Sequence, residues 1–311
     1  MRILIVCSGN APGFEFQKHQ AFIYEQVEAL KRLDDSLQFD YFFIKGKGPG
    51  GYLSCLEVLR KQLQSQPYHA IHAHVAMSGL LANLQRRVPV ITTFHGSDIN
   101  EPTLRAVSGL VERLSRKTIY VSPILARKAL AGQHQKRAVI PCGVDSELFK
   151  PRPKQECRAY FSLSPNKRYV LFSSAFGNSV KNYPLAKAAL EHLQDDSVAL
   201  LELKNYTRHE VALLFSAVDA ALMTSHSEGS PQFVKEALAC NCPVVSTDVG
   251  DVRLVLGNVP GCYLTSYQAT DVAEKLRWAL TNTTPIAGQE HIRHFNNQLI
   301  ARQIRDVYRQ I

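Results

Sequence analysis

The sequence has few features of a membrane, secreted or metal-binding protein. No apolar run approaches the roughly 20 residues that a helix needs to cross a bilayer. The seven cysteines are an odd number without a C-x-x-C spacing, so we interpret them as free thiols in a reducing compartment. Cys240 and Cys242 are close enough to share a metal, but no second pair accompanies them. Buried thiols are therefore the favoured interpretation of that pair.

Two further patterns are missing near the start of the chain. Residues 1–7 are too few for a signal peptide and have no cleavage-site pattern, so we expect a buried first strand there. The glycine-rich segment 8–13 follows, but it does not match the dinucleotide-binding pattern G-x-G-x-x-G. We expect it to form a loop that lines a cleft, with Gly9 and Gly13 as the residues that make it flexible.

Length and composition indicate a globular protein with two domains of ordinary size. The 311 residues are 45% hydrophobic and 20% charged, and the single tryptophan, Trp278, is interpreted as packing. The net charge is +9, and residues 1–150 carry +7 of it, with 19 Lys and Arg against 12 Asp and Glu. A basic first half favours an acidic partner, such as a membrane surface or a charged lipid-linked substrate. Nucleic-acid binding is an alternative, but the basic pairs fall at element ends without interleaved aromatic residues.

Strand and helix patterns alternate along the chain. In the first half, strands are predicted at 3–7, 39–44, 70–74, 90–94, 118–121 and 138–140, and helices at about 18–33, 53–64, 78–85, 102–114 and 123–130. The second half has strands at 169–174, 199–203, 220–223 and 243–245, and helices after 181, from 231 and at about 271–280. This alternation predicts an α/β fold with parallel sheets, helices on both faces and ligands beyond the carboxyl ends of the strands.

The most informative segment is 225–248. An apolar strand ends before it, and Ser230 and Pro231 then predict a helix that begins at Pro231, because Ser is a favoured N-cap and Pro suits the first helical position. A strand, loop and helix in this order place free backbone N–H groups and the positive helix end beyond the strand. Gly229 to Gln232 therefore form a candidate site for a phosphate or diphosphate.

Two carboxylates bracket this anion site. Glu228 precedes the helix and Glu236 lies on its second turn. A carboxylate repels a phosphate, so we infer that each accepts hydrogen bonds from hydroxyls, one from a sugar and the other from a ribose. From spacing alone, two solvated glutamates on a surface helix are equally plausible. Lys181, at another strand–helix junction, could reach the phosphate, although by itself a surface lysine is the commoner case.

Histidines follow two strands of the first half. His72 and His74 share one face of a predicted strand, and His95, Gly96 and Asp98 follow the next strand. H-x-H with a later His and Asp is also compatible with a divalent metal in a hydrolase, but no further ligands appear at suitable strand ends. We favour His95 as a group that hydrogen-bonds a substrate, with Gly96 allowing close approach of the backbone.

The two halves join near I-P-C-G-V-D at 140–145, where Gly143 suits a turn of positive φ. Pro151-Arg152-Pro153 is stiff and predicts an interdomain linker. In the last segment an apolar helical stripe, 292–311, predicts a terminal helix.

Taken together, these motifs resemble the family 4 retaining glycosyltransferases of the GT-B fold. Glu228 and Glu236 match the E-x7-E signature of that family, within a stretch that also has its Ser225, Gly229 and P-V-V strand. T-x-H-G-x-D at 93–98 and I-P-x-G-V-D at 140–145 precede it in the same order. Asn241 replaces a usual Gly and also tolerates a left-handed turn. The resemblance spans nearly the whole chain and is strongest to bacterial enzymes that build surface polysaccharides.

The resemblance implies a fold of two Rossmann-like doubly wound domains that face a central cleft. Residues 1–150 would form the acceptor-side domain, 151–288 the nucleotide-sugar-binding domain, and 289–311 a helix that crosses back onto the first domain. In this family the first loop, with Gly9 and Gly13, faces the acceptor side.

The resemblance also assigns roles to residues. His95 and Glu228 would be catalytic groups at the donor sugar, Glu236 would hold the ribose, and Lys181 would neutralise the diphosphate. Asn178 lies near the place of a second family cation, an Arg. The remaining donor-binding candidates are Gly229, Ser230, Pro231 and Gln232, and the cleft candidates are Gly9, Gly13, His74, Gly96 and Asn178.

The expected activity is metal-independent transfer of a sugar, with retention of configuration, from a nucleotide-diphosphate donor to a glycan or lipid-linked acceptor in surface polysaccharide biosynthesis. We expect no cofactor, no bound metal and no D-x-D motif for one. The expected location is cytoplasmic, at the inner face of the membrane if the basic half contacts acidic lipid. The alternative is a nucleotide-sugar epimerase or hydrolase, or a catalytically weak binding protein of the same fold, which the missing Arg near Asn178 motivates.

Overall fold

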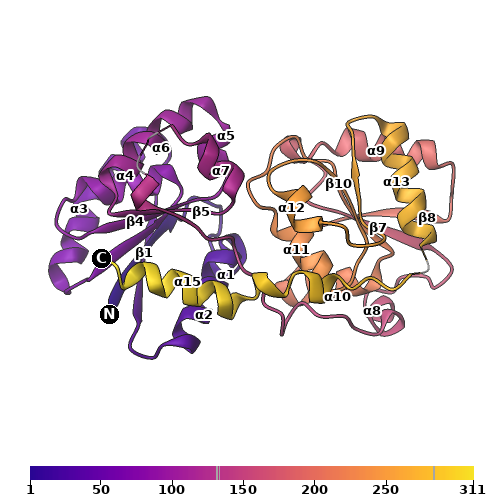
Figure 1. Ribbon diagram of the computed structural model, residues 1–311, viewed down its shortest axis with the longest axis horizontal. Helices are drawn as coiled ribbons and strands as arrows, with labels where there is room; N and C mark the ends of the chain where they lie inside the picture. Colours follow the sequence, from indigo (N-terminus) through magenta and orange to yellow (C-terminus); the bar gives the residue numbers. More distant parts are fainter. Residues whose placement is uncertain (131, 133, 283) are drawn as a thin grey trace. The chain divides into compact units, whose positions relative to one another are not determined.

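The computed structural model describes residues 1–130, 132, 134–282 and 284–311, and the chain divides into two compact units. Unit 1 contains Met1–Gly143 and Asn297–Ile311, and unit 2 contains Val144–Asn296. Each unit is built on one parallel sheet flanked by helices (Figure 1), which confirms the predicted α/β class. The division falls at 143/144 and 296/297, whereas the sequence analysis placed its boundaries at 150/151 and 288/289.

The sheet of unit 1 has six parallel strands in the order β2-β1-β3-β4-β5-β6. From β1 the chain proceeds to β2 on one side and then to β3 on the other, so the topological switch lies between β1 and β3. Parallel sheets bind ligands beyond the carboxyl ends of their strands at such a switch. The strands are β1 (Arg2–Ser8), β2 (Gln38–Ile44), β3 (Ala70–His74), β4 (Val90–Phe94), β5 (Lys117–Tyr120) and β6 (Arg137–Val139).

Helices cover both faces of this sheet (Figure 1). Ile3 and Ile5 of β1 share a core with α2 and α15, whereas Leu4 and Val6 share one with α3 and α4, as the alternation of side chains along a strand requires. The terminal helix α15 therefore packs within unit 1, beside α2. The helices are α1 (Phe16–His19), α2 (Ala21–Leu33), α3 (Gly48–Ser65), α4 (Ala76–Leu84), α5 (Ser97–Asn100), α6 (Pro102–Leu114), α7 (Pro123–Lys128) and α15 (Asn297–Tyr308), with a 3₁₀ turn η1 (His134–Lys136).

Unit 2 repeats the plan with five parallel strands in the order β11-β10-β9-β7-β8. Its switch lies between β7 and β9, so the loops at 173–182 and 224–231 lie at the edge where such sheets bind ligands. The strands are β7 (Arg168–Phe172), β8 (Val198–Glu202), β9 (Ala220–Met223), β10 (Val244–Thr247) and β11 (Tyr263–Thr265).

The helices of unit 2 form two layers. Val170 and Phe172 of β7 pack toward α9 and α13, and Leu171 packs toward α10, α11 and α12. None of the described helices in either unit combines the length and apolarity that a bilayer span requires. The helices are α8 (Lys154–Tyr160), α9 (Tyr183–Leu193), α10 (Arg208–Ala217), α11 (Gln232–Ala239), α12 (Val252–Leu256), α13 (Ala269–Thr281) and α14 (Gly288–His291), with 3₁₀ turns η2 (Ser179–Lys181) and η3 (Arg293–Phe295).

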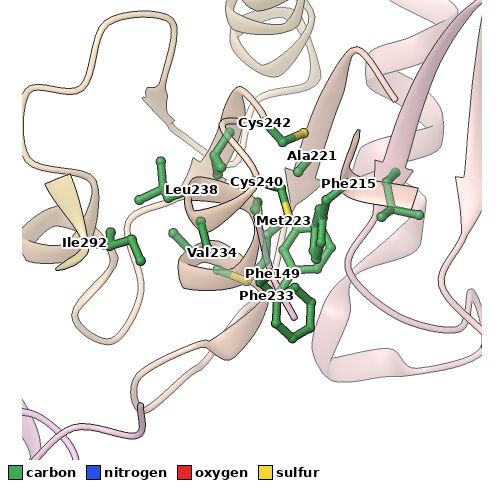
Figure 2. Packing of buried hydrophobic residues seen from close by; sticks show 14 of the residues in the cluster. Phe149, Phe215, Ala221, Met223, Phe233, Val234, Leu238, Cys240, Cys242 and Ile292 are labelled. Atoms are coloured by element: carbon green, nitrogen blue, oxygen red, sulfur yellow. The ribbon is translucent and has the colours of Figure 1, made fainter. Parts of the chain in front are cut away.

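A dense apolar core holds α11 against its sheet (Figure 2). The ring of Phe215 lies 6.4 Å from that of Phe149 and 5.2 Å from that of Phe233, measured between centroids. All residues of α11 from Phe233 to Ala239 are buried. Since close-packed side chains leave little freedom of movement, this core fixes the helix and, with it, the loop that precedes it.

Two local predictions in unit 1 were wrong. The helix expected at 18–33 is interrupted at Gln20, whose backbone (φ −132°, ψ 42°) is not helical. Gly143 is not among the described residues with positive φ. A Cβ at Gly143 would instead collide with Oδ1 of Asn297 and lie 3.0 Å from its Cα. The glycine is therefore needed for close approach to the start of α15, not for a left-handed turn.

The segment Pro151-Arg152-Pro153 is not at the division between the units. It lies within unit 2, and Pro153 is the N-cap of α8. Its two prolines therefore lead into a helix of unit 2, and the prediction of an interdomain linker there was wrong. In contrast, Asn241 has the left-handed conformation that its position in the sequence predicts, with φ 55°.

Candidate functional site

The loops that follow β7 and β9 are joined by an ion pair. Lys181 donates a hydrogen bond from Nζ to Oε1 of Glu228 over 2.6 Å, and the two side chains are 20% and 15% exposed. The backbones are joined as well, because the N–H of His226 donates to the carbonyl oxygen of Val180 over 2.9 Å, and Thr224 Oγ1 donates to the carbonyl oxygen of Lys181 over 3.0 Å. The structure thus brings two residues from the sequence analysis together at the topological switch of unit 2.

The loop after Glu228 rests on the turn that follows β10. Ser230 donates a hydrogen bond from Oγ to Oδ2 of Asp251 over 2.6 Å. Gly250 has φ 58°, and a Cβ there would lie 2.7 Å from the carbonyl oxygen of Gly229 and 2.9 Å from that of Glu228. Gly250 therefore permits both the left-handed backbone and the close packing that hold this loop.

Helix α11 begins one position later than the sequence predicted. Pro231 is the N-cap, with φ −69° and ψ 120°, and no side chain caps the helix. Ser230 was the expected N-cap, but its hydroxyl is bonded to Asp251. The correction leaves the anion site unchanged, since the first N–H groups of α11, from Gln232 onward, have no acceptor within the helix. Gln232 also accepts a hydrogen bond from Lys235 Nζ over 3.2 Å.

Glu236 is paired with a residue that the sequence analysis missed. The Glu236 side chain is 5% exposed, and its Oε1 accepts a hydrogen bond from Nη2 of Arg208 over 2.7 Å. Arg208 is the first residue of α10, a helix that was not predicted. A signal for this helix was present, because Thr207 and Glu210 before the apolar Val211 form the pattern of a capping box.

Asn178 lies in the same loop as Lys181 but supplies no charge. Its Oδ1 accepts a hydrogen bond from the backbone N–H of Val180 over 3.2 Å, and its Nδ2 donates to Ser174 Oγ over 3.4 Å. The side chain therefore shapes the loop by capping η2. The residue that the sequence resemblance places near the family's Arg is thus a turn-forming amide.

In unit 1, His74 at the end of β3 and His95 directly after β4 lie together. Nδ1 of His74 and Nε2 of His95 are 3.0 Å apart, and the rings are stacked with centroids separated by 5.3 Å. Asp98 holds this turn by accepting hydrogen bonds from the backbone N–H groups of His95 (2.9 Å) and Ala76 (2.6 Å). Burial lowers the pKa of His74 well below its usual value, and the rings of His72 and His95 lower it further. His74 is therefore neutral at neutral pH.

His72 has a structural role. Its Nδ1 lies 2.7 Å from the hydroxyl of Tyr308 on α15, and its Nε2 lies 2.7 Å from Oγ1 of Thr93. Burial lowers the pKa of His72 to about 3, with a further contribution from His95. Because both ring nitrogens are engaged, this ring is not available to a metal. Within the described residues, no three His, Cys, Asp or Glu side chains are placed to hold a metal ion.

The three glycines predicted near the unit 1 site have different surroundings. Gly96 has φ 139° and is the N-cap of α5, which permits the sharp turn after His95. Gly9 packs closely, since a Cβ there would lie 2.9 Å from Cβ of Phe43. Gly13 has φ 58° and no atom within 4 Å of a Cβ. A hollow beyond β1 and β2 is lined by Gly9, Ala11, Phe14, Phe16, Phe43 and Lys45.

The cysteines are free thiols, and all except the half-buried Cys262 are buried. Cys240 and Cys242 contact separate backbone carbonyls, those of Ala212 (3.8 Å) and Pro243 (3.6 Å). Burial raises the pKa of both thiols. Since a metal ligand must be a thiolate, these environments favour the structural interpretation of the pair.

The carboxyl edge of unit 2 thus combines two chemical functions. Lys181 and the first amides of α11 can bind an anion, while Glu228 and Glu236 can accept hydrogen bonds from hydroxyls. Each carboxylate is itself held by a cation, Lys181 for Glu228 and Arg208 for Glu236. This arrangement is suited to a ligand in which a phosphate group lies between two polyhydroxylated groups.

Comparison with known proteins defines the class first. The whole chain superimposes on sucrose-phosphate synthase from Thermosynechococcus elongatus with a TM-score of 0.81 and 18% identity, covering 99% of this chain and 98% of the other. It also matches HepE from Anabaena in complex with UDP-glucose, with a TM-score of 0.78 and 16% identity over the full length of both. These likenesses show the fold, the GT-B arrangement of two Rossmann-like domains.

Family models cover most of the chain. Residues 12–148 match the model described as Glycosyltransferase Family 4, and residues 155–298 match the model described as Glycosyl transferases group 1. The chain therefore belongs to the family 4 glycosyltransferases of the GT-B fold.

Its curated relatives are longer proteins. TuaC of Bacillus subtilis (strain 168), named for glycosyltransfer in teichuronic acid biosynthesis, is 27% identical in a 248-residue alignment that covers 70% of this chain and 63% of TuaC. D-inositol 3-phosphate glycosyltransferase of Mycobacterium marinum is 26% identical in a 249-residue alignment that covers 64% of this chain and 53% of that protein. The chain thus spans somewhat more than half the length of these relatives.

Proposed function

We propose that the protein is a glycosyltransferase that moves a sugar from a nucleotide-diphosphate donor to a glycan or lipid-linked acceptor in polysaccharide biosynthesis. The observation that carries the proposal is the pairing of Lys181 with Glu228 beside the start of α11, at the topological switch of unit 2. Support comes from the family membership and from HepE, a protein of the same fold whose structure contains UDP-glucose.

Each group at this edge has a role in the proposal. Lys181 and the backbone N–H groups of α11 bind the diphosphate and stabilise the charge that grows on it as it leaves. Glu236 accepts hydrogen bonds from the ribose, and Glu228 does so from the donor sugar. Gly229, Ser230 and Pro231 form the loop between Glu228 and α11. The positions of Glu228 and of the α11 N–H groups therefore depend on the packing of this loop against Gly250.

We further propose that transfer retains configuration and needs no metal. In the transfer, the bond between the sugar's anomeric carbon and the diphosphate oxygen breaks, and a bond to the acceptor oxygen forms. The acceptor hydroxyl proton passes to a phosphate oxygen of the leaving group, so no protein nucleophile is required. His95 of unit 1 would contact the donor sugar, and His74 would orient the His95 ring through their 3.0 Å contact. The basic first half would attract an acidic acceptor or membrane surface.

The test is to incubate the protein with UDP-glucose, GDP-mannose and other nucleotide sugars, with and without lipid extracts or glycan acceptors. Proton NMR would identify each product and its anomeric configuration, and a parallel series in EDTA would test the need for metal. Transfer with a retained anomeric configuration in EDTA is the expected result. A rearranged sugar, or free sugar released at the same rate with and without acceptor, would support an epimerase or hydrolase instead.

A further inference from the structure

Arg208 connects the start of α10 to the middle of α11. Its Nη2 lies 2.7 Å from Oε1 of Glu236, and the two side chains are 29% and 5% exposed. The inference below rests on the proposed function, in which Glu236 binds the ribose of the donor. It concerns how that carboxylate is held and which sugars it can distinguish.

The position of Arg208 is not explained by the stability of its own helix. The first turn of a helix carries a partial positive charge, so a cation there is unfavourable. The N-terminus of α10 is already capped by a capping box. Glu210 Oε2 accepts a hydrogen bond from the N–H of Thr207 over 2.7 Å, and Thr207 Oγ1 accepts one from the N–H of Glu210 over 3.3 Å. The cap needs no arginine at 208, so the reason for this residue lies in the contacts of its guanidinium.

The guanidinium is supported by the core on one face. Its Cζ lies 4.7 Å from the ring centroid of Phe149, a geometry that favours a cation–π interaction. Phe149 is fully buried and packs against Phe215 (Figure 2). The ring is therefore a fixed contact for the guanidinium that donates to Glu236.

A guanidinium held against a fixed ring also orients the carboxylate that it contacts. A carboxylate has two oxygens and about four acceptor positions, so a bond from Arg208 to Oε1 fixes the orientation of the group and leaves capacity for hydroxyl donors. A ribose presents two adjacent hydroxyls, and both can be bound only if the carboxylate faces them correctly. A 2′-deoxyribose presents one of the two.

We propose that Arg208 is a positioning residue that orients Glu236 to accept hydrogen bonds from both hydroxyls of a ribose, and that this makes the site select ribonucleotide over 2′-deoxyribonucleotide donors. A lysine would keep the positive charge but lose the planar group that stacks on Phe149 and directs the hydrogen bond. The selectivity is therefore a property of the guanidinium and its support, in addition to Glu236 itself.

The test measures the dissociation constants of UDP, CDP, ADP and GDP, each beside its 2′-deoxy form, by isothermal titration calorimetry. The proteins are wild type, Arg208→Met, Arg208→Lys and the matched control Arg158→Met. Arg158 has the same kinds of contact away from α11, since it pairs with Asp219 over 2.7 Å and lies 5.3 Å from the ring centroid of Tyr169. The control therefore reports what the loss of a half-buried, ion-paired arginine beside an aromatic ring does in general.

We expect wild type to bind the ribose form of its preferred nucleotide at least about tenfold more tightly than the 2′-deoxy form, since a site built around a hydroxyl rejects the analogue that lacks it. Arg208→Met should bring this ratio close to one, Arg208→Lys should give an intermediate ratio, and Arg158→Met should keep the wild-type ratio even if its melting temperature falls.

An unchanged ratio in folded Arg208→Met would overturn the inference and leave the proposed function intact, as would a wild-type ratio near one. If Arg208→Met does not fold, Arg208→Lys decides, because a wild-type ratio with lysine would contradict the role of the planar group. Failure of wild type to bind any of the nucleoside diphosphates would instead overturn the proposed function, and the inference with it.

Discussion

Nζ of Lys181 lies 2.6 Å from Oε1 of Glu228, and this contact joins the loops after β7 and β9, which are separated by many residues in the sequence. The two strands flank the topological switch of unit 2. A cation and a carboxylate in contact at this edge can serve two neighbouring parts of one ligand, an anionic group and a hydroxyl-bearing group.

Replacing Lys181 by Met should weaken binding of the donor. The variant removes the ammonium from the proposed diphosphate site and leaves the 15%-exposed Glu228 without this cation. We expect the donor Kd to rise at least about tenfold, the equivalent of about 1.4 kcal/mol. Lys187→Met is the matched control, because Lys187 pairs with Glu191 at 4.0 Å on an exposed surface. Equal nucleotide affinity in wild type and Lys181→Met would remove Lys181 from the site.

Replacing Gly250 by Ala should also weaken donor binding. The added methyl group would lie 2.7 Å from the carbonyl oxygen of Gly229 and 2.9 Å from that of Glu228. The loop of Glu228 and Gly229 would have to shift, and overcrowding of this kind costs about 1–3 kcal/mol. Gly48→Ala is a control for backbone strain alone, since Gly48 has a similar φ of 67° but no atom within 4 Å of a Cβ. The nucleotide Kd should rise for Gly250→Ala and stay unchanged for Gly48→Ala, and an unchanged Kd for both would contradict the dependence of the donor site on this packing.

Replacing Gly143 by Ala should destabilise unit 1. A Cβ there would lie 3.0 Å from Cα of Asn297, the first residue of α15, and would collide with its Oδ1. We expect the free energy of unfolding to fall by about 1–3 kcal/mol, as for other overpacked sites. Gly50→Ala in α3, where no atom lies within 4 Å of a Cβ, is the control and should be neutral or slightly stabilising. Urea denaturation measures both variants. Equal midpoints for Gly143→Ala and Gly50→Ala would contradict the prediction that crowding against Asn297 destabilises unit 1.

The stability of the protein should fall in acid partly through His72. Its pKa is about 3 in the folded protein, against about 6.5 in an unfolded chain. The unfolded state therefore binds more protons between these values, so the contribution of His72 is complete above pH 6.5 and is lost as pH falls toward 3. Between these pH values, His72 lowers the free energy of unfolding by up to about 1.4 kcal/mol for each unit by which the pH falls.

His72→Gln removes this titration. Although the variant loses hydrogen bonds to Tyr308 and Thr93 and should be less stable at pH 7.5, its free energy of unfolding should decline less between pH 6.5 and pH 4.5 than that of wild type. Urea denaturation at several pH values measures the two slopes. Equal slopes would mean that His72 does not remain neutral in the folded protein.

Motifs within single segments were sufficient to predict much of this protein. The alternation of strands and helices gave the α/β class, and the segment around Glu228 indicated a strand, a polar loop and a helix in the correct order. The helix starts at Gln232 and not at Pro231 because the hydroxyl of Ser230, the expected cap, binds Asp251 instead. The hydrogen bond from Ser230 to Asp251 could not be predicted from the segment around Ser230, because Asp251 is distant in the sequence.

Contacts between distant segments account for what the sequence could not provide. The pairing of Arg208 with Glu236 depends on how α10 packs beside α11, and no periodicity reports that packing. Gly143 was assigned to a left-handed turn because turns are the usual reason for a glycine. The actual reason, its contact with Asn297, becomes visible only when α15 is in place.

The central claim, that unit 2 binds a nucleoside diphosphate through Glu236, is tested most directly by a thermal-shift panel. UDP, GDP, ADP, CDP and dTDP sugars would be added to wild type, to Glu236→Ala and to the control Glu290→Ala, whose side chain is 78% exposed. The account predicts that one nucleotide raises the melting temperature of wild type and of the control, as binding to the folded state requires, and that Glu236→Ala loses the shift. An equal shift in wild type and Glu236→Ala, or no shift in wild type with any donor, would contradict it.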